Sequence, residues 1–279
     1  MTVGRPFIEF IQSQVLPWTK GLYGGARPAV EMRMLSLDEE SGSSSTLLRY
    51  PAGWRQDDPQ ALTADEELFV LAGSLTVGDV RHERYGYAHL PAGYVRPAMA
   101  SPHGAVVLTF FSGEPRAAAA VTRGVDEARL VEAVDAFDGP WTGNFHPRFP
   151  SGAGRKFLRE DPYDGEQTWV LGTMPLRWGR RAEKHPVVEE MYLLAGELVG
   201  HVGTMRAGAY FWRPEEEWHG PFGSPTGNLM LFRTKGGPLS TVYEDDEREF
   251  SWQPEHRPIL PPGLTELGGK PWDGGCACY

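Results

Sequence analysis

Short apolar runs alternate with clusters of Gly, Pro, Asp and Ser along most of the chain. Examples are the runs "ELFVLAG" (67–73), "YAHLP" (87–91) and "AVVLTFF" (105–111). Runs of this length that are bounded by turn formers are typical of strands rather than helices. The pattern therefore predicts an all-β fold, in which short strands and tight turns form a small barrel or sandwich.

The pattern of strands and turns occurs twice. Residues 33–113 align with residues 156–236 at a constant offset of 123, without a gap. Matched identities include Leu35/Leu158, Glu66/Glu189, Gly73/Gly196, Tyr87/Tyr210 and Leu108/Leu231. Internal repetition of this kind indicates two copies of one domain. A chain of 279 residues suits two domains of roughly 110–125 residues, each large enough to own a core.

The segments outside the repeats give less regular patterns. Residues 125–137, "VDEARLVEAVDAF", space their apolar groups near the helical period and carry acids towards the start, which predicts a linking helix. Residues 5–18 fit either a helix or an added strand. The chain is predicted to divide into an extension over 1–24, a first domain over 25–120, a linker over 121–149, a second domain over 150–245 and a tail over 246–279. The part of the tail from residue 253 is rich in Pro and Gly and is expected to wrap the surface.

Composition narrows the classes of partner. The net charge is −10 and the pI is about 5.3, which argues against nucleic acid and anionic membranes as partners and favours a small-molecule substrate. No apolar run approaches a membrane span, and Glu9 and Gln12 interrupt the N-terminal stretch, so no signal peptide is predicted. The two cysteines, Cys276 and Cys278, build no disulfide framework, and their role stays open. We therefore expect a cytoplasmic protein.

Four potential metal ligands are concentrated in the second repeat. The segment "EKHPVVEEMYLLAG" (183–196) is followed by "PEEEWH" (214–219). Glu183 and His185 alternate onto one face of a strand, Glu189 follows a short turn, and His219 arrives from a later strand. Four nitrogen or oxygen ligands are thereby expected to converge.

These two segments resemble the motifs of the cupin superfamily. The first cupin motif reads His-x-His, three or four residues, Glu, six residues, Gly, and the second reads Pro-x-Gly-x-x-His. His185, Glu189, Gly196 and His219 match these motifs, whereas Glu183 replaces the first histidine, and Glu216 replaces the glycine of the second motif. The resemblance implies a bicupin of two tandem double-stranded β-helix (jelly-roll) barrels. It is similar to the ChrR-type anti-sigma-factor cupin domain.

The resemblance also implies one divalent metal per chain, in the C-terminal barrel. Its ligands would be His185, Glu189 and His219, with Glu183 as the fourth. A set of two histidines and one or two carboxylates suits Fe(II), Mn(II) or Ni(II) at least as well as Zn(II), and Fe(II) is the ion we expect first. If Glu183 is not a ligand, it is placed to act as a catalytic general base. Both roles of Glu183 stay open.

The first repeat lacks this ligand set. It retains the carboxylate as Glu66 but carries Gln60, Leu62 and Arg96 at the positions of the other three ligands. We therefore predict that the N-terminal barrel holds no metal and that Arg96 pairs with Glu66. Its role is then structural, for example in the interface of a homodimer. The other histidines are expected to lie on the surface or in local hydrogen bonds; they are His82, His89, His103, His146, His201 and His256.

Aromatic and cationic residues surround the second-repeat motifs. An aromatic or otherwise flat substrate that carries a carboxylate or carbonyl is expected, and the candidate substrate-binding residues are Arg181, Tyr210, Trp212 and Arg213. The favoured function is a metal-dependent enzyme of the dioxygenase, decarboxylase or isomerase type, with dioxygenase-like oxidoreductase activity first. The alternative is a non-catalytic cupin protein that binds or senses a metal or a small ligand. We expect the enzyme, because aromatic residues surround the motifs and because the sequence pattern predicts no helical sigma-binding domain before the repeats.

Overall fold

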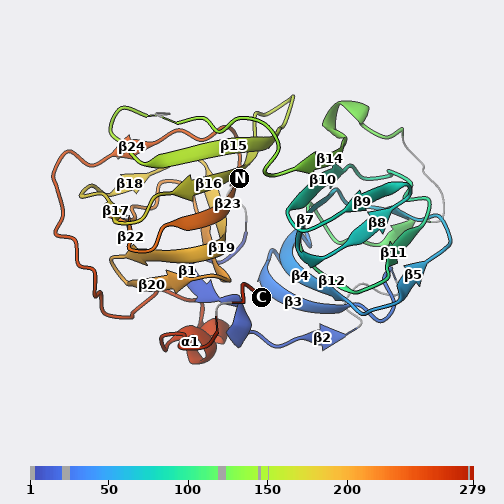
Figure 1. Ribbon diagram of the computed structural model, residues 1–279, viewed down its shortest axis with the longest axis horizontal. Coiled ribbons are helices and arrows are strands. Elements are labelled where there is room, and N and C mark those ends of the chain that lie inside the picture. The colour runs from blue at the N-terminus through green and yellow to red at the C-terminus, as the bar shows by residue number, and fades with distance from the viewer. Residues whose placement is uncertain (1–3, 21–25, 119–123, 144–145, 150, 276) are drawn as a thin grey trace. The chain divides into compact units, whose positions relative to one another are not determined.

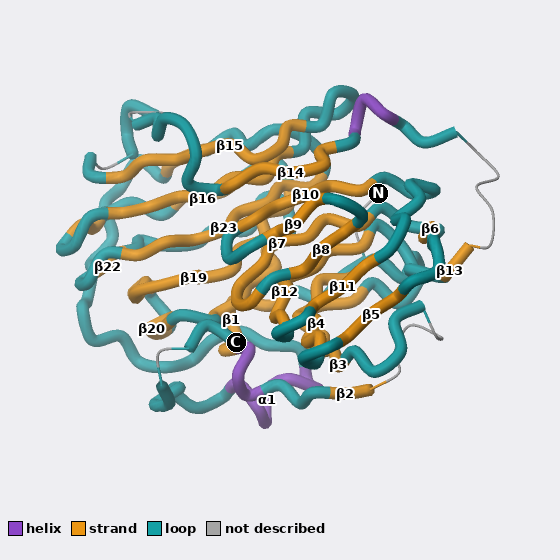
Figure 2. The backbone as a smooth tube through the Cα atoms, turned by 45° about the vertical axis from the view of Figure 1, so that its right-hand side comes forward, coloured by secondary structure: helices purple, strands orange, loops and turns teal. Residues whose placement is uncertain are grey.

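The computed structural model describes residues 4–20, 26–118, 124–143, 146–149, 151–275 and 277–279. Within these residues the regular structure is nearly all β, which confirms the all-β prediction (Figures 1 and 2). Helical structure in this part of the chain comprises the helix α1 (Pro262–Gly268) and the 3₁₀ turns η1 (Ser13–Val15) and η2 (Glu127–Arg129). None of the helices among the described residues has the length and apolar character needed to cross a membrane.

The chain divides into two compact units. Residues Leu16–Asp138 form one unit, named here the first-repeat unit. Met1–Val15 and Gly139–Tyr279 form the other, named here the second-repeat unit. The N-terminal residues therefore belong with the second repeat, whereas the sequence pattern places them in a separate extension.

The first-repeat unit contains three sheets among its described residues, with strand orders β14-β10-β7-β12-β4-β3-β2, β5-β11-β8-β9 and β13-β6. The strands are β2 (Thr19–Lys20), β3 (Glu31–Leu37), β4 (Ser44–Tyr50), β5 (Trp54–Gln56), β6 (Ala61–Leu62), β7 (Glu66–Gly73), β8 (Leu75–Val77), β9 (Val80–His82), β10 (Gly86–Leu90), β11 (Met99–Ser101), β12 (Ala105–Phe111), β13 (Ala117–Ala118) and β14 (Val131–Asp135).

The second-repeat unit is built on a sheet of order β1-β21-β19-β23-β16-β15, which β20, β22 and β17 extend, and on the pair β18-β24. The strands are β1 (Ile8–Gln12), β15 (Ala153–Glu160), β16 (Gln167–Thr173), β17 (Arg177–Trp178), β18 (Glu183–Lys184), β19 (Val188–Gly200), β20 (Gly203–Arg206), β21 (Ala209–Arg213), β22 (Gly223–Ser224), β23 (Asn228–Lys235) and β24 (Val242–Tyr243). The C-terminal tail packs on this unit, where the Arg257 amide donates to the Val202 carbonyl.

The repeat in the sequence is a repeat of strands. The bounds of β4 and β10, shifted by 123 residues, are the bounds of β16 and β21. The central ladders also correspond, because β7 pairs with β10 and β12 as β19 pairs with β21 and β23. In both units the hydrogen-bonded ladders are open sheets, so the strand pairing itself does not establish the predicted closed barrels.

A pair of matched glycines shows why the two repeats bend alike. Gly73 and Gly196 have φ of +69° and +78°, in the left-handed region that favours glycine. A Cβ atom at either position would lie 2.0 Å from a backbone carbonyl oxygen, that of Gly104 or Gly227 respectively. Any side chain here would push the neighbouring loop out of place. The glycine of the first motif is therefore required by backbone approach in both repeats.

The predicted linking helix over residues 125–137 is wrong. Only Glu127–Arg129 form a 3₁₀ turn, and Val131–Asp135 form strand β14, which pairs with β10. The β-branched side chains of Val131 and Val134 suit a strand, and the backbone of β14 satisfies the free edge of β10. The pairing partner lies 40 or more residues away in the sequence, so local periodicity does not reveal it. The open choice for residues 5–18 resolves as strand β1 followed by η1.

Candidate metal centre and cavity

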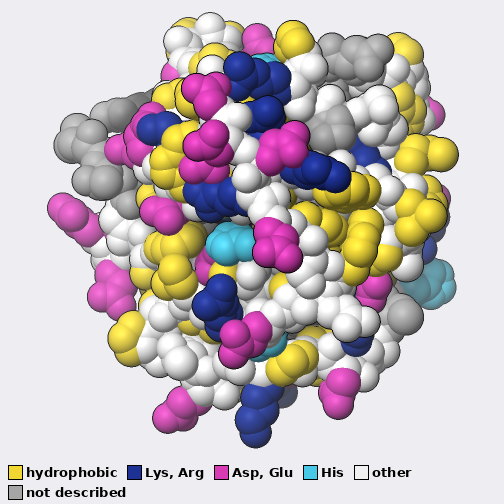
Figure 3. Space-filling model, turned by 90° about the vertical axis from the view of Figure 1, so that its left-hand side faces the viewer, with side chains coloured by type: hydrophobic (Ala, Val, Ile, Leu, Met, Phe, Trp, Pro, Cys, Tyr) yellow, Lys and Arg dark blue, Asp and Glu magenta, His cyan; other side chains and the backbone are white. Residues whose placement is uncertain are grey.

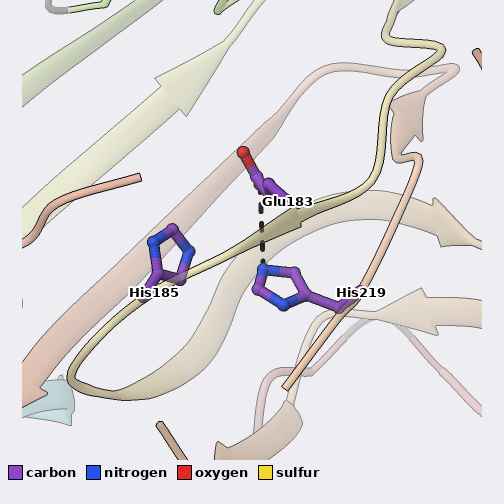
Figure 4. Close-up of side chains that lie close together, drawn as sticks. All are labelled: Glu183, His185 and His219. Carbon is purple, nitrogen blue, oxygen red and sulfur yellow. Dashed lines mark ion pairs between the residues drawn. The ribbon is translucent and has the colours of Figure 1, made fainter. Parts of the chain in front are cut away.

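Three potential metal ligands reach one place from two segments of the second-repeat unit. Glu183 begins β18, and His185 follows that strand directly. His219 lies between β21 and β22, and its backbone forms an antiparallel bridge with Glu183 through two N–H···O bonds of 2.9 Å. This bridge fixes the two segments side by side, so the three side chains point toward one another (Figure 4).

The donor atoms of this group are close enough to share one ion. Glu183, His185 and His219 each offer an atom within 4.8 Å of the others. Glu189, at the start of β19, lies on the same site: its Oε1 is 3.5 Å from His185 Nε2 and its Oε2 is 3.7 Å from His219 Nε2. The structure thus brings together all four residues that the sequence motifs indicate.

The hydrogen bonds of the two histidines fix their tautomers. Nδ1 of His185 lies 2.9 Å from the Ser240 carbonyl, and Nδ1 of His219 lies 2.9 Å from the Glu217 carbonyl. A carbonyl only accepts, so both Nδ1 atoms carry the hydrogen, and in the neutral imidazole each Nε2 presents a lone pair. Both Nε2 atoms are buried without a hydrogen-bond partner. Buried acceptors left unsatisfied are costly, and this donor set fits a divalent metal ion.

The electrostatic surroundings keep His219 neutral. Burial is the main cause that lowers the pKa of His219 well below its ordinary value, and the nearby charge of Arg213 lowers it further. A neutral imidazole is the form that binds a metal.

Glu189 is shared between the site and an arginine. Arg213 lies opposite Glu189 in the β19–β21 ladder, and its Nη1 donates to Glu189 Oε2 at 2.6 Å. Both side chains are buried. The arginine anchors one carboxylate oxygen, while the other oxygen is directed toward His185.

Glu183 has a different environment, because a tyrosine holds it. Tyr243 lies opposite Glu183 in the β18–β24 ladder, and its hydroxyl donates a hydrogen bond to the carboxylate. Burial is the main cause that raises the pKa of Glu183, and the neighbouring charge of Glu189 raises it further. Glu183 is therefore a carboxylate positioned by its own hydrogen bond, at the edge of the donor group.

These residues lie in a cavity of about 310 Å³. Its lining combines aromatic and aliphatic side chains with a similar number of polar and charged ones, among them three arginines and two glutamates. The lining residues are His146, Phe149, Arg155, Trp169, Leu171, Thr173, Arg177, Glu183, His185, Glu189, Leu198, Phe211, Arg213, His219, Phe222, Gly223, Ser224, Met230, Phe232, Leu239, Ser240, Thr241 and Tyr243. On the side of the molecule where β17, β22 and β24 lie, acidic, basic and apolar side chains are interspersed (Figure 3).

Three of the four predicted substrate-binding residues lie outside the cavity. Arg213 lines it, but Arg181 instead donates to the carbonyls of Glu244 and Asp245. Tyr210 and Trp212 are buried on the opposite face of β21 from Phe211 and Arg213, which line the cavity.

The reason for this correction is strand alternation. Side chains on β21 point alternately to the two faces of the sheet, and both faces are buried, so polarity does not reveal which set is inward. The Tyr210 hydroxyl donates to Glu190 at 2.7 Å, and Arg5 stacks 4.2 Å from the Trp212 ring centroid. These two aromatics thus serve packing on the outer face.

Sequence reasoning missed Arg155 and Tyr243. Arg177, by contrast, belongs to the basic stretch 177–181 from which the sequence predicts an arginine that orients an anionic substrate, and it lines the cavity. Arg155 enters from β15, and Tyr243 lies after the aligned repeat. Both reach the site through strand pairing that the sequence does not display.

The first-repeat unit keeps Glu66 at the position of Glu189 but lacks counterparts of the other three potential metal ligands. The predicted pair is present: Arg96 Nη2 lies 2.9 Å from Glu66 Oε2, and Arg27 Nη2 lies 2.6 Å from Glu66 Oε1, all three side chains being buried. Five apolar core residues, Met32, Tyr50, Trp54, Leu62 and Leu90, stand at the positions of Arg155, Thr173, Arg177, His185 and Arg213. Apolar packing therefore occupies the space that is polar in the second-repeat unit.

Among the other histidines, His146 departs from expectation because it lines the cavity and its ring contacts Tyr243 at 4.8 Å. His89, His201 and His256 make local contacts, with the Arg129 carbonyl, Glu9 and the Gly268 carbonyl respectively. His82 is buried and His103 is exposed. Cys278 is buried, whereas Cys276 falls outside the described residues.

Solved structures with the same arrangement of strands identify the class of fold. A structure of a proposed dioxygenase from Nostoc punctiforme aligns with a TM-score of 0.76 at 20% identity, covering 90% of this chain and 92% of that one. A variant of oxalate decarboxylase from Bacillus subtilis aligns with a TM-score of 0.56 at 12% identity, covering 84% and 78%. The same enzyme at pH 4.6 gives a TM-score of 0.54. The chain has the cupin fold.

A family model matches residues 11–240, and the chain belongs to that family, described as "Domain of unknown function (DUF4437)". No curated protein sequence matches the chain.

Proposed function

We propose that this protein is a metal-dependent bicupin enzyme with one divalent metal in the second-repeat unit. His185, Glu189 and His219 would hold the ion, with Glu183 as the fourth ligand. The observation that carries the proposal is the pair of buried Nε2 lone pairs of His185 and His219, which lack hydrogen-bond partners and converge beside two carboxylates. Fe(II) is the first choice, and Mn(II), Ni(II) and Zn(II) suit the same donors.

The site and the fold support a choice of reaction class for this proposal. A divalent ion in such a site acts as a Lewis acid toward a carbonyl or carboxylate oxygen, or provides a centre for oxygen chemistry. The structural neighbours, a proposed dioxygenase and an oxalate decarboxylase, support a dioxygenase or decarboxylase type. An isomerase would use the same Lewis-acid role of the ion.

The protein's own residues prepare the site in defined ways. Carbonyls of Ser240 and Glu217 orient the two imidazoles, and Arg213 holds Glu189 in place. The Tyr243 hydroxyl fixes Glu183 at the cavity wall, where its carboxylate can accept a proton from a bound substrate if it is not engaged as a ligand. The aromatic and aliphatic side chains of the lining lower the local dielectric and so strengthen these interactions.

Metal analysis of the purified protein tests this proposal. Protein prepared without added metal should contain about one divalent ion per chain, and His185→Ala and His219→Ala should each abolish it. His103→Ala is the matched control, because His103 is exposed and outside the cavity, and it should retain the metal. Unchanged metal content in both site variants would place the ion elsewhere.

Activity screening with the identified metal separates the enzyme from the alternative. We expect conversion of a small carbonyl or carboxylate compound by the loaded wild type and none by His219→Ala. Saturable binding of such compounds without any conversion would favour a sensing protein instead.

A further inference from the structure

The cavity holds more positive than negative side chains. Arg155, Arg177 and Arg213 line it, against the carboxylates of Glu183 and Glu189. With neutral histidines, the ionised lining groups sum to one positive charge, and a divalent ion would raise the excess to three. A partly enclosed excess of positive charge favours an anionic ligand, because low-dielectric walls strengthen the attraction.

Arg177 is placed to act close to the candidate metal centre. It lies opposite Ser224 in the β17–β22 ladder, and both residues line the cavity. Its guanidinium packs 4.1 Å from the ring centroid of Phe149. Burial lowers the pKa of Arg177, and the negative charge of Glu183 opposes that shift, so the two groups interact electrostatically.

Arg155 supplies a second guanidinium from another strand. It lies opposite Leu171 in the β15–β16 ladder and packs 4.7 Å from the Phe157 ring centroid. Arg177 Nε also donates to the Ser151 carbonyl at 3.2 Å, and Arg213 is bound to Glu189 and belongs to the candidate metal centre. Two guanidinium groups in one cavity match the planar geometry of a carboxylate.

An aromatic wall adjoins the metal-ligand candidates. Trp169 and Phe232 stack with centroids 5.3 Å apart and planes 8° apart, and Phe211 lies 6.2 Å from Phe232. Phe211 is two residues from Arg213 on β21, so the wall is about 7 Å from the Glu189–Arg213 pair along the strands. A ring-sized apolar body resting on this wall would lie next to the ion.

The first repeat provides an internal comparison. Met32 and Trp54, both buried in its core, stand at the positions of Arg155 and Arg177, and Thr46 stands at that of Trp169. The arginines and the aromatic wall are therefore absent from the copy that also lacks the ligand set. This coincidence links the arginines to the metal site rather than to the stability of the fold.

We propose that this cavity binds a small organic carboxylate with a ring-sized apolar body. Arg177 and Arg155 hold the carboxylate, and Trp169, Phe211 and Phe232 contact the body. The conversion of this ligand rests on the proposed function. Its binding can be measured independently of any reaction. A two-carbon dianion would leave the aromatic wall uncovered. The cavity, at about 310 Å³, lies at the small end of the volumes usual for small-molecule sites, so it accommodates a small ligand with one ring.

Calorimetric titration with three probes tests this assignment. Phenylacetate carries both features, phenylacetamide replaces the charge by a neutral amide, and acetate lacks the ring. Metal-loaded wild type should bind phenylacetate at least about tenfold more tightly than either other probe. Arg177→Gln should reduce the preference over phenylacetamide to about threefold or less, while Arg177→Lys, which keeps a positive charge, should retain most of it.

Matched variants distinguish this inference from the proposed function. Arg180→Gln removes an exposed arginine outside the cavity and should bind all three probes as wild type does. The His185→Ala/His219→Ala variant should still prefer phenylacetate in an Arg177-dependent manner, even if no metal binds to any form. Thermal melts confirm that each variant is folded. Three results would overturn the inference: no saturable binding of phenylacetate by wild type, equal binding of acetate, or a preference that survives Arg177→Gln but disappears with the two histidines.

Discussion

Ile11 lies opposite Tyr210 in the antiparallel ladder between β1 and β21 of the second-repeat unit. Val134, which follows Ile11 by 123 residues, takes the same position opposite Tyr87 in the first-repeat unit. Each unit thus receives an edge strand from the segment that precedes the other repeat in the sequence. The repeat extends to these strands, although few side chains are shared between them.

The edge strands β1 and β14 differ in how deeply their side chains are buried, and this difference predicts how much each strand contributes to stability. Ile11 is 1% exposed, whereas Val134 is partly exposed. Ile11→Ala should lower the free energy of unfolding by about 2–4 kcal/mol, and Val134→Ala by clearly less, because truncation costs most where a buried cavity remains. Urea denaturation measures both. If both variants lose the same free energy of unfolding, the burial of β1 does not determine how much this strand contributes to stability.

Metal binding should stabilise the folded protein through His185 and His219. An ion that binds only the folded state adds about 2.7 kcal/mol when its concentration is one hundred times Kd. Chelation should therefore lower the Tm of the wild type, and adding the metal back should restore it. His219→Ala should show neither shift. A shift of similar size in that variant would indicate binding at another site.

Replacement of Glu183 by Gln tests its part in the site. Because Glu183 offers an oxygen within 4.8 Å of both histidine donor atoms, we expect Glu183→Gln to weaken metal affinity about tenfold or more. Tyr243→Phe, which removes the hydrogen bond but not the carboxylate, should retain most of the metal. Titration with the metal, followed by an activity assay, measures both effects. Full metal content with lost activity in Glu183→Gln would instead identify a general base.

The buried ionic cluster of the first-repeat unit predicts an order of destabilisation. Glu66 lies between Arg27 and Arg96, so Glu66→Ala leaves two buried guanidinium groups without their shared carboxylate. Its cost should exceed that of Arg96→Ala, for which about 3–5 kcal/mol is expected. Chemical denaturation compares the two. A smaller cost for Glu66→Ala would mean that another group neutralises the arginines.

The same cluster predicts a response to acid. Burial alone would raise the pKa of Glu66, but the charges of Arg27 and Arg96 outweigh burial and hold it below its ordinary value. The stabilisation by the ionised form is therefore complete above about pH 4.3 and is lost as the pH falls through the lower folded value. The stability advantage of wild type over Glu66→Gln should shrink below about pH 4. An advantage that stays constant down to pH 2 would contradict this.

Much of the site was readable from the sequence because its signals are local or repeated. His185, Glu189 and His219 follow from motif spacing, and the comparison of the two repeats at a fixed offset predicts both the lost site and the Arg96–Glu66 pair. The all-β class follows from short apolar runs between turn formers. In each case the information lies within one strand and turn, or in the alignment of one repeat with the other.

Tertiary structure alone decided which strand joins which sheet and which face points inward. Residues 125–137 have a helical apolar period, yet β14 forms because the edge of β10 needs a partner. Tyr210 and Trp212 were indistinguishable from Phe211 and Arg213, since β21 is buried on both faces and alternation leaves no polar side to mark the surface. Arg155 and Tyr243 enter the cavity through long-range pairing. Such contacts depend on the packing of segments distant in the sequence, which no local pattern records.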